Sequence, residues 1–191
     1  MAMEAEGKVT RGAQKLQGAL GALEIDLKDK LVLDIGSSTG GFTEVALKSG
    51  ARKVVAAEKG TGQMRGDLVM DGRVELHEKT DIFDFEMLER PDVVLADVSF
   101  VSLRKVLIYA KRHLVGEGTK FLVMLKPQFE VDGAALHKGV IKSSKVRREA
   151  IKEFEVWLKD NGFVVLGKRD NELMGRFGNQ ERFYYLQIAG A

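Results

Sequence analysis

Short apolar runs alternate with longer amphipathic segments along most of the chain. The apolar runs have the length and residue types of buried strands. We expect strands at Leu31–Ile35, Lys53–Ala57, Val74–His77, Val93–Ala96 and Lys120–Leu125. Apolar residues at helical spacing predict helices within 11–25, 39–49 and 103–113. This alternation predicts a parallel sheet that is covered by helices on both faces.

The C-terminal part of the chain has a different pattern. Val146, Ala150, Ile151, Phe154 and Leu158 mark the apolar stripe of a longer helix, which the glycine of "KDNG" ends. Two β-rich runs follow, "GFVVLGKRD" and "RFYYLQIAG", without a helix between them that could make a parallel crossover. We therefore expect these runs to pair antiparallel at one edge. The predicted fold is α/β, a mostly parallel seven-stranded sheet with an antiparallel C-terminal strand pair, which is the layout of Rossmann-like class I methyltransferases.

The composition is that of an ordinary globular protein, with 45% hydrophobic residues, 30% charged residues and a formal net charge of +2. No apolar run is long enough to span a bilayer, and the start "MAMEAEGKVTRG" lacks the apolar core of a signal peptide. We therefore expect a cytoplasmic protein without stable membrane association. The absence of cysteine excludes disulfides and thiolate chemistry, and the three histidines lack metal-ligand spacing, so we expect no metal site.

The segment "DIGSSTGGF" joins the first expected strand to a helix through a glycine-rich turn. Glycines let the backbone turn sharply and approach a ligand, and the helix N-terminus offers N–H groups without a partner in the helix. The spacing differs from the G-x-G-x-x-G of dinucleotide-binding turns, which argues against a pyrophosphate ligand. A tight turn without a ligand also explains the segment taken alone. The candidate cofactor-binding residues here are Asp34, Gly36, Ser37, Ser38, Thr39, Gly40, Gly41 and Phe42.

Four acidic residues, Asp34, Glu58, Asp81 and Asp97, lie at or just beyond the ends of successive expected strands. The carboxyl ends of parallel strands form the ligand-binding edge of such a sheet. There Glu58 could accept hydrogen bonds from ribose hydroxyls, and Asp81 could contact an adenine amino group. An acidic edge repels a pyrophosphate and suits a sulfonium and an amino group, which favours S-adenosylmethionine as the cofactor. Each acid taken alone is better explained as a turn or capping residue. The candidate set at this edge also includes Lys59 and Ile82.

Lys126 ends the fifth expected strand in "VMLKPQFE", and Pro127 biases its backbone to an extended conformation. A lysine at the end of a buried strand is costly unless it is paired or functional. One interpretation is a lysine whose charged end reaches solvent, and the other is a neutral amine that accepts a proton. Glu181, at the start of the last expected strand in "RFGNQERF", is a weaker candidate because a hairpin loop explains the residues before it.

Basic residues cluster just before and within the long C-terminal helix, and a smaller group lies near the start of the chain. Such patches can bind phosphates at a net charge near neutral, although a solvated helix face explains the larger cluster equally well. The candidate phosphate-binding residues are Arg11, Lys138, Lys142, Lys145, Arg147 and Arg148.

Six segments taken together resemble one family. They are "VTRGAQKL", "LDIGSSTGGFTE", "GTGQM", "LADVSFVSL", "MLKPQFE" and "GNQE", in this order and within residues 9–186. The combination resembles the TlyA family, ribosomal RNA 2′-O-methyltransferases of the wider FtsJ group that are also labelled hemolysin-like. The resemblance implies an S-adenosylmethionine-dependent enzyme that methylates ribosomal RNA or ribosomal subunits, with cytidine as the expected nucleoside. It also implies that the basic candidates contact RNA.

The resemblance further implies a catalytic Lys-Asp-Lys-Glu tetrad, carried here by Lys15, Asp97, Lys126 and Glu181. Lys126 would accept the proton of a ribose 2′-hydroxyl while that oxygen attacks the cofactor methyl group. Asp97 would orient Lys126 and the methyl group, and Lys15 with Glu181 would complete the charge network. Positioning should supply most of the acceleration, because a sulfonium is already an activated leaving group.

The sequence also departs from the family pattern. Family members usually carry an N-terminal S4 RNA-binding domain before the "RG" segment; here we expect residues 1–8 to be a leader or truncated linker and residues 9–191 to form the catalytic domain. Glu58 replaces the more usual aspartate, a change that should preserve ribose binding. Three other functions stay open: a non-catalytic RNA- or ribosome-binding module that keeps the cofactor fold, a membrane-active hemolysin-like protein, and a nicotinamide-dependent oxidoreductase.

Overall fold

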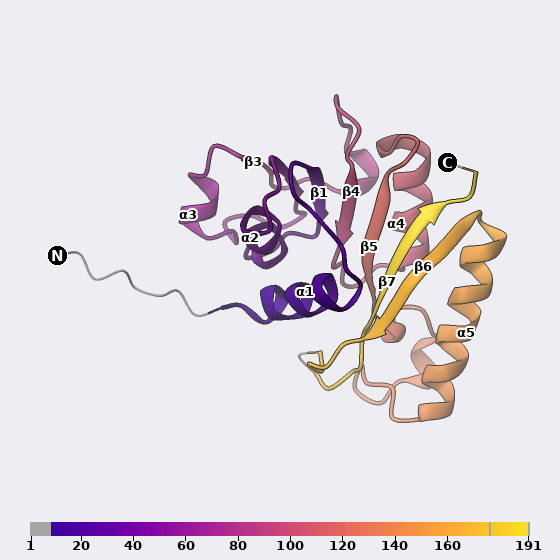
Figure 1. Ribbon diagram of the computed structural model, residues 1–191. Coiled ribbons are helices and arrows are strands. Elements are labelled where there is room, and N and C mark those ends of the chain that lie inside the picture. Colours follow the sequence, from indigo (N-terminus) through magenta and orange to yellow (C-terminus); the bar gives the residue numbers. More distant parts are fainter. Residues whose placement is uncertain (1–8, 176, 191) are drawn as a thin grey trace.

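One mixed sheet forms the centre of the protein in the computed structural model, which describes residues 9–175 and 177–190 (Figure 1). Its strands are β1 (Leu31–Ile35), β2 (Lys53–Ala57), β3 (Val74–His77), β4 (Val93–Ala96), β5 (Lys120–Leu125), β6 (Phe163–Asp170) and β7 (Arg182–Ile188). The order is β3-β2-β1-β4-β5-β7-β6, in which β1 to β5 are parallel and β7 is antiparallel to both β5 and β6. The predicted fold class is confirmed, whereas the leader expected at residues 1–8 lies outside the described residues.

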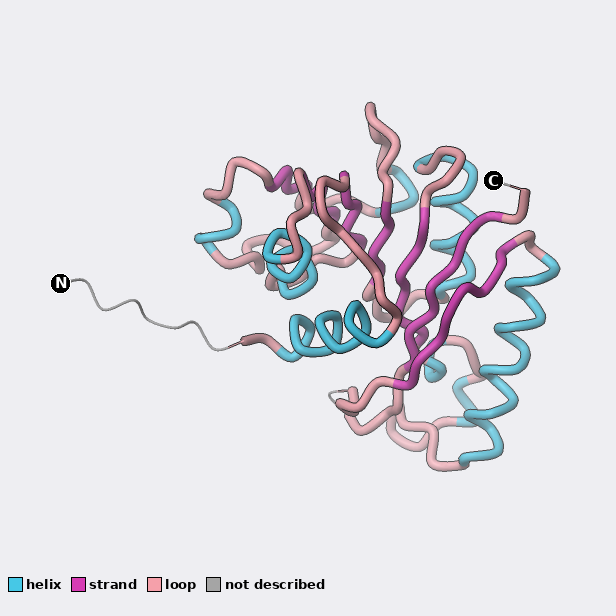
Figure 2. The backbone as a smooth tube through the Cα atoms, in the orientation of Figure 1, coloured by secondary structure: helices cyan, strands magenta, loops and turns pink. Residues whose placement is uncertain are grey.

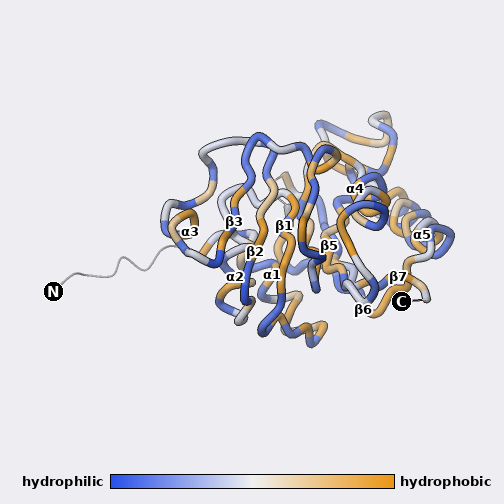
Figure 3. Tube along the Cα trace, turned by 90° about the horizontal axis from the view of Figure 1, so that it is seen from above, coloured by the Kyte–Doolittle hydropathy of each residue, from blue (hydrophilic) through white to orange (hydrophobic). Residues whose placement is uncertain are grey.

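Helices cover both faces of this sheet, as the alternating pattern predicts (Figures 1 and 2). One face carries α1 (Arg11–Ala22), α2 (Gly41–Lys48) and α3 (Gly66–Val69), and the other carries α4 (Leu103–Tyr109) and α5 (Ser144–Asp160). Successive residues of β5 therefore alternate between two hydrophobic clusters: Phe121 and Val123 pack with α4 and α5, whereas Leu122 and Met124 pack with α1 and α2. Figure 3 shows hydrophobic colours along β1 and β2 in the interior and hydrophilic colours mainly in the outer loops.

The two longest helices begin at hydroxyl caps. Thr10 precedes α1, and its Oγ1 accepts a hydrogen bond of 3.1 Å from the Ala13 N–H. Ser143 precedes α5, and its Oγ accepts a hydrogen bond of 3.4 Å from the Val146 N–H. After α5 the chain turns through Gly162 at a φ of 73°, which agrees with the glycine stop expected from "KDNG".

The observed helices differ from the expected pattern in four places. α2 begins at Gly41 because Gly40 before it has a left-handed φ of 87°. The helix expected over 103–113 is α4 followed by a π-helical turn over Ala110–Leu114. Between β2 and β3 the chain forms only α3, and between β3 and β4 only a 3₁₀ turn at Ile82–Asp84. These last two elements are too short to produce a helical period in the sequence.

The topology brings six loops to one edge of the sheet. The carboxyl ends of the parallel strands β1 to β5 meet there, and β7 starts at the same edge because Leu125 pairs with Arg182. Ligands bind at this edge in open α/β sheets. No helix in the described part of the chain is long and apolar enough to cross a membrane.

Candidate cofactor and catalytic site

The glycine-rich turn after β1 leaves no room for side chains at two positions. Gly36 has a φ of 81°, and a Cβ there would lie 2.9 Å from the Asp97 carbonyl oxygen. A Cβ at Gly40 would lie 2.3 Å from Leu68 Cδ1. Only glycine combines this backbone conformation with such close approach. The turn therefore lies directly against the loop that carries Asp97.

A cleft of about 150 Å³ opens between this turn, the start of α1 and Asp97. Six of the predicted cofactor residues and Asp97 line it, together with Thr10 and Gly12 from the start of α1. A Cβ at Gly41 would lie 2.5 Å from Thr10 Oγ1, so the two segments are in tight contact. Thr10 and Gly12 were not among the predicted residues, although they belong to the "VTRG" segment of the resemblance. The predicted residues on the cleft are Gly36, Ser37, Ser38, Thr39, Gly41 and Phe42.

Asp34 lies below the turn and is fully buried. The Thr43 hydroxyl donates a hydrogen bond of 2.7 Å to its Oδ2, whereas Oδ1 has no hydrogen-bond partner among the described residues. Burial raises the pKa of Asp34 to about 7, an effect that the Thr43 hydroxyl opposes and the charges of Asp97 and Glu58 reinforce. A buried acceptor oxygen of this kind suits a cationic or amino donor from a bound ligand.

The buried carboxyl of Asp34 should make stability depend on pH. Its pKa in the folded state, about 7, lies above the ordinary value of 3.8, so the folded protein binds the proton more tightly. The resulting stabilisation is lost as the pH rises from about 4 to 7. The side chain of Asp34→Asn cannot titrate, so this variant should lack the pH-dependent loss of stability. That loss amounts to at most about 4 kcal/mol in the free energy of unfolding. Thermal unfolding of both proteins at pH 5 and pH 8 measures the difference, in which pH-independent costs cancel. Parallel pH profiles would contradict the assignment.

Glu58 joins the glycine-rich turn to the loop after β2. Its Oε2 accepts a hydrogen bond of 2.9 Å from the Ser38 N–H, and its Oε1 accepts one of 2.7 Å from the Gly60 N–H. A carboxylate has about four acceptor positions, so these two bonds orient the group and leave capacity for hydroxyls. The predicted contact with ribose agrees with this geometry and stays a prediction.

Asp81 uses its carboxylate within the chain. Oδ1 accepts a hydrogen bond of 3.2 Å from the Phe83 N–H, and Oδ2 lies 2.8 Å from Lys59 Nζ. Lys59 is highly exposed, so its contact with Asp81 is at the rim of the site. Ile82 is buried in the cluster below α4. The structure thus gives Asp81 a capping role beside the cofactor edge, and its contact with adenine stays a prediction.

Lys126 and Asp97 form an ion pair at the edge of the sheet. Lys126 Nζ lies 2.6 Å from Asp97 Oδ1 and donates a hydrogen bond of 2.8 Å to Ser99 Oγ. The Lys126 backbone is extended, with φ −109° and ψ 94°, as Pro127 after it predicts. The Lys126 side chain is only 11% exposed, so the pair rather than solvent compensates most of its charge. Ser99 was not predicted from the sequence.

Lys15 and Glu181 form a second, more deeply buried ion pair. Lys15 Nζ lies 2.5 Å from Glu181 Oε2, and the two side chains are 9% and 5% exposed. The pair joins α1 to the start of β7. Leu125 at the end of β5 pairs with Arg182 at the start of β7. Lys126 directly follows Leu125, and Glu181 directly precedes Arg182, so both lie at the same end of two adjacent strands. The structure therefore brings all four predicted tetrad residues to one edge as two lysine–carboxylate pairs.

Phe100 is a further residue of this edge that the sequence did not single out. Its side chain is 89% exposed, and its φ of 64° is in the left-handed region that non-glycine residues rarely adopt. Such backbone conformations occur preferentially at functional sites. This exposed ring lies three residues after Asp97, with its centroid 5.3 Å from that of Phe129.

The predicted basic residues differ in accessibility. Arg147 donates hydrogen bonds to Asp170 (2.7 Å) and to the Gln180 carbonyl oxygen (3.2 Å), so its guanidinium holds α5 to the β6–β7 hairpin. Arg11 donates to the Met174 carbonyl oxygen. The other four candidates are exposed and stay predictions as phosphate contacts; they are Lys138, Lys142, Lys145 and Arg148.

The family profile described as FtsJ-like methyltransferase matches residues 8–187, almost the whole chain. The chain belongs to the FtsJ-like methyltransferase family. It is therefore an S-adenosylmethionine-dependent methyltransferase, and the oxidoreductase alternative is wrong. The buried Asp34 Oδ1, which has no hydrogen-bond partner among the described residues, and the tight glycine turn fit this cofactor.

Relatives of known name agree with the resemblance to the TlyA family. The chain is 36% identical to the 23S rRNA (cytidine-2′-O)-methyltransferase TlyA of Campylobacter jejuni, over 93% of this chain and 70% of the relative. It is 38% identical to the 16S/23S rRNA (cytidine-2′-O)-methyltransferase TlyA of Mycobacterium tuberculosis, over 94% of this chain and 68% of the relative. A solved structure, a proposed hemolysin from Streptococcus thermophilus, superposes with a TM-score of 0.91 at 30% identity, over 100% of this chain and 70% of that one. The chain thus spans about two thirds of the length of these proteins.

Proposed function

We propose that this enzyme methylates the 2′-hydroxyl of a ribose in ribosomal RNA, with cytidine as the acceptor nucleoside, in the cytoplasm. The observation that carries the proposal is the Lys126–Asp97 pair, which lies beside the glycine-rich turn because Gly36 packs against the Asp97 carbonyl. A lysine beside the cofactor cleft is suited to an acceptor that must lose a proton. The names of the two TlyA relatives support the choice of ribosomal RNA and of cytidine.

The cofactor, when bound, supplies a methyl group on a positively charged sulfur. Lys126 acts as a base in its neutral form, after its ammonium group has lost a proton to solvent. The amine then holds the acceptor hydroxyl and takes its proton as the oxygen gains the methyl group. Asp97 and Ser99 fix the Lys126 amine, since both lie within hydrogen-bonding distance of Nζ. Most of the acceleration comes from holding the acceptor oxygen in line with the methyl group.

Lys15 and Glu181 position the acceptor side of this site. A buried ion pair is seldom a source of net stability, because removing two charges from water costs about as much as their attraction returns. The pair instead holds fixed charge at the start of β7, next to the end of β5 where Lys126 lies. We assign the pair to the catalytic network as positioning residues.

The cofactor residues divide by their contacts. The glycine-rich turn and the buried Asp34 hold the amino acid part, and Glu58 holds the ribose, with its orientation set by Ser38 and Gly60. Asp81, with Lys59 and Ile82, shapes the rim next to the adenine. Arg11 and the four exposed basic candidates contact the RNA backbone, as cations do in most sequence-independent RNA binding.

Methyl transfer to ribosomal subunits tests this function directly. The protein is incubated with labelled S-adenosylmethionine and unmodified 30S or 50S subunits, and 2′-O-methyl positions are mapped on the extracted RNA. We expect label at a small number of cytidines. Cofactor and RNA binding without any transfer, also after fusion to an S4 domain, would instead identify a non-catalytic RNA-binding module. Transfer to a base nitrogen or carbon would contradict the assigned acceptor.

A further inference from the structure

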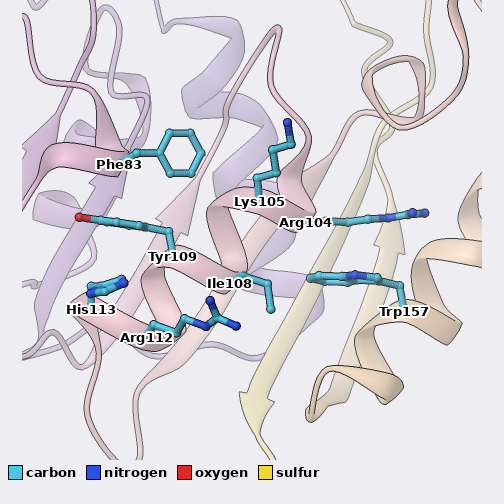
Figure 4. A pocket seen from close by; sticks show the side chains of 8 residues that line it. All are labelled: Phe83, Arg104, Lys105, Ile108, Tyr109, Arg112, His113 and Trp157. Atoms are coloured by element: carbon cyan, nitrogen blue, oxygen red, sulfur yellow. The ribbon is translucent and has the colours of Figure 1, made fainter.

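A second groove lies on the opposite face of the sheet from the glycine-rich turn, along α4. It has a volume of about 440 Å³ and is bordered by the 3₁₀ turn after β3, by α4 with its π-helical turn, and by α5. Figure 4 shows aromatic rings and cationic side chains around it, with Ile108 among them. No part of the proposed reaction uses this groove.

The aromatic rings of the groove are held in fixed orientations. Phe83 meets Tyr109 edge to face, with ring centroids 5.5 Å apart and an interplanar angle of 85°. Tyr109 lies over His113 with centroids 4.6 Å apart. On the α5 side, Trp157 stacks on Phe154 in the core and is seen edge-on beside the Arg104 guanidinium in Figure 4. The groove therefore offers flat, rigid surfaces to a planar ligand.

The ionisable groups that line the groove favour an anion. Besides Tyr109 they are Arg104, Lys105, Arg112 and His113, and no acidic residue is among the lining residues. Lys105 and Arg112 form no ion pair within the described part of the chain and are exposed. Burial, together with the negative charges of Glu86 and Asp84, raises the pKa of Tyr109, so these acids disfavour negative charge at its hydroxyl. A phosphate is thus favoured on the Lys105 and Arg112 side and disfavoured near that hydroxyl.

Hydrogen bonds join the start of α4, which borders the groove, to the segment after Lys126 at the catalytic edge. Glu130, four residues after Lys126, accepts hydrogen bonds from the Ser102 hydroxyl (2.7 Å) and the Leu103 N–H (2.6 Å) at the start of α4. Arg104 Nε lies 3.5 Å from the same carboxylate. The Arg104 Nε and Nη2 atoms are buried without a hydrogen-bond partner among the described residues. The first cation of the groove therefore lies within ion-pair distance of the segment that follows Lys126.

We propose that this groove binds unpaired nucleotides of the ribosomal RNA substrate that flank the methylated nucleotide, with a base on its aromatic rings and phosphates on Lys105 and Arg112. The proposal rests on ribosomal RNA being the substrate. Single-stranded nucleic acids are bound by this combination of cations along the backbone and aromatic rings under the bases. An acidic protein segment would use the cations but has no need of the stacked rings.

The only tryptophan of the chain, Trp157, reports on this groove. A ten-residue oligocytidylate is titrated into the full chain while tryptophan fluorescence is followed at several salt concentrations. We expect saturable quenching. In Lys105→Glu/Arg112→Glu the midpoint should rise at least tenfold, and the salt slope of binding should fall by roughly 1.4, since each single-strand phosphate contact contributes roughly 0.7.

A matched pair of charge reversals controls for net charge. Lys28→Glu/Lys30→Glu changes the same number of charges in the turn between α1 and β1, which does not border the groove, and should leave the titration unchanged. Calorimetric binding of the cofactor verifies that each variant is folded. Equal quenching by the groove variant would overturn the proposal. Quenching by a polyglutamate peptide as strong as that by RNA would overturn it in favour of an acidic protein partner.

Methyl transfer separates this proposal from the function on which it rests. If the wild type methylates ribosomal subunits but the oligonucleotide leaves Trp157 unquenched, the groove assignment fails and the function stands. If quenching occurs but the wild type transfers no methyl group, the proposed function fails.

Discussion

Lys126→Met should reduce methyl transfer to ribosomal RNA by about 10²- to 10⁴-fold, the usual contribution of a positioned proton acceptor. The substitution removes the amine that lies 2.6 Å from Asp97 and 2.8 Å from Ser99. Methionine preserves most of the length and the apolar stem of the side chain. Cofactor affinity should change little, because among the described residues no hydrogen bond or ion pair joins Lys126 to the glycine-rich turn or to Glu58. Initial rates with labelled cofactor and calorimetric titration measure the two quantities separately.

Two variants show whether the loss comes from proton transfer. Lys126→Arg keeps a positive charge beside Asp97 but cannot act as a base, so this variant should be nearly as inactive as Lys126→Met. Lys120→Met removes a lysine from the other end of the same strand, where it donates a hydrogen bond to Gln187, and should keep near wild-type activity. Activity within a factor of three of wild type in Lys126→Met would rule out the catalytic assignment.

Gly36→Ala should weaken cofactor binding at least ~100-fold, equivalent to about 2.7 kcal/mol. The added Cβ would lie 2.9 Å from the Asp97 carbonyl oxygen at a φ of 81°, and neither the backbone oxygen nor the left-handed conformation can accommodate it cheaply. The turn must shift away from Asp97, which deforms the cleft. We also expect a loss of about 1–3 kcal/mol in the free energy of unfolding. Calorimetry and denaturant titration measure these effects.

Gly18→Ala is the matched control for this substitution. Gly18 lies within α1, and a Cβ there would meet nothing within 4 Å. Alanine should stabilise the helix by up to about 1 kcal/mol and leave cofactor affinity unchanged. Wild-type affinity in Gly36→Ala would mean that the turn is not the cofactor site.

The sequence predicted the sheet better than its connections. All five parallel strands begin and end as expected. Four of them, β1, β2, β4 and β5, are short and mainly apolar runs bounded by polar or glycine residues, whereas β3 alternates apolar with polar residues. α3 and the 3₁₀ turn at Ile82–Asp84 escaped prediction since four and three residues cannot show a helical period. The position of β7 between β5 and β6 likewise depends on tertiary pairing rather than on local pattern.

Site features that depend on neighbouring residues could be predicted from the sequence, whereas contacts between distant segments could not. The conformation of Lys126 followed from the proline after it, and the glycines followed from the turn they form. The partner of Glu181 could not be predicted from local pattern, because Lys15 is 166 residues away in the sequence. Only the resemblance to a family connected the two residues. The contact of Arg147 with Asp170 could not be predicted either, because Asp170 belongs to the C-terminal hairpin.

The buried contact between Lys15 and Glu181 also determines when the site can form during synthesis. It closes a loop of 166 residues, an entropically expensive closure that cannot form before the start of β7 has been made. The cofactor turn and its strand partners are complete long before β7 is made. A nascent chain can therefore organise its cofactor side first, whereas the acceptor side is assembled later, when β7 joins the sheet.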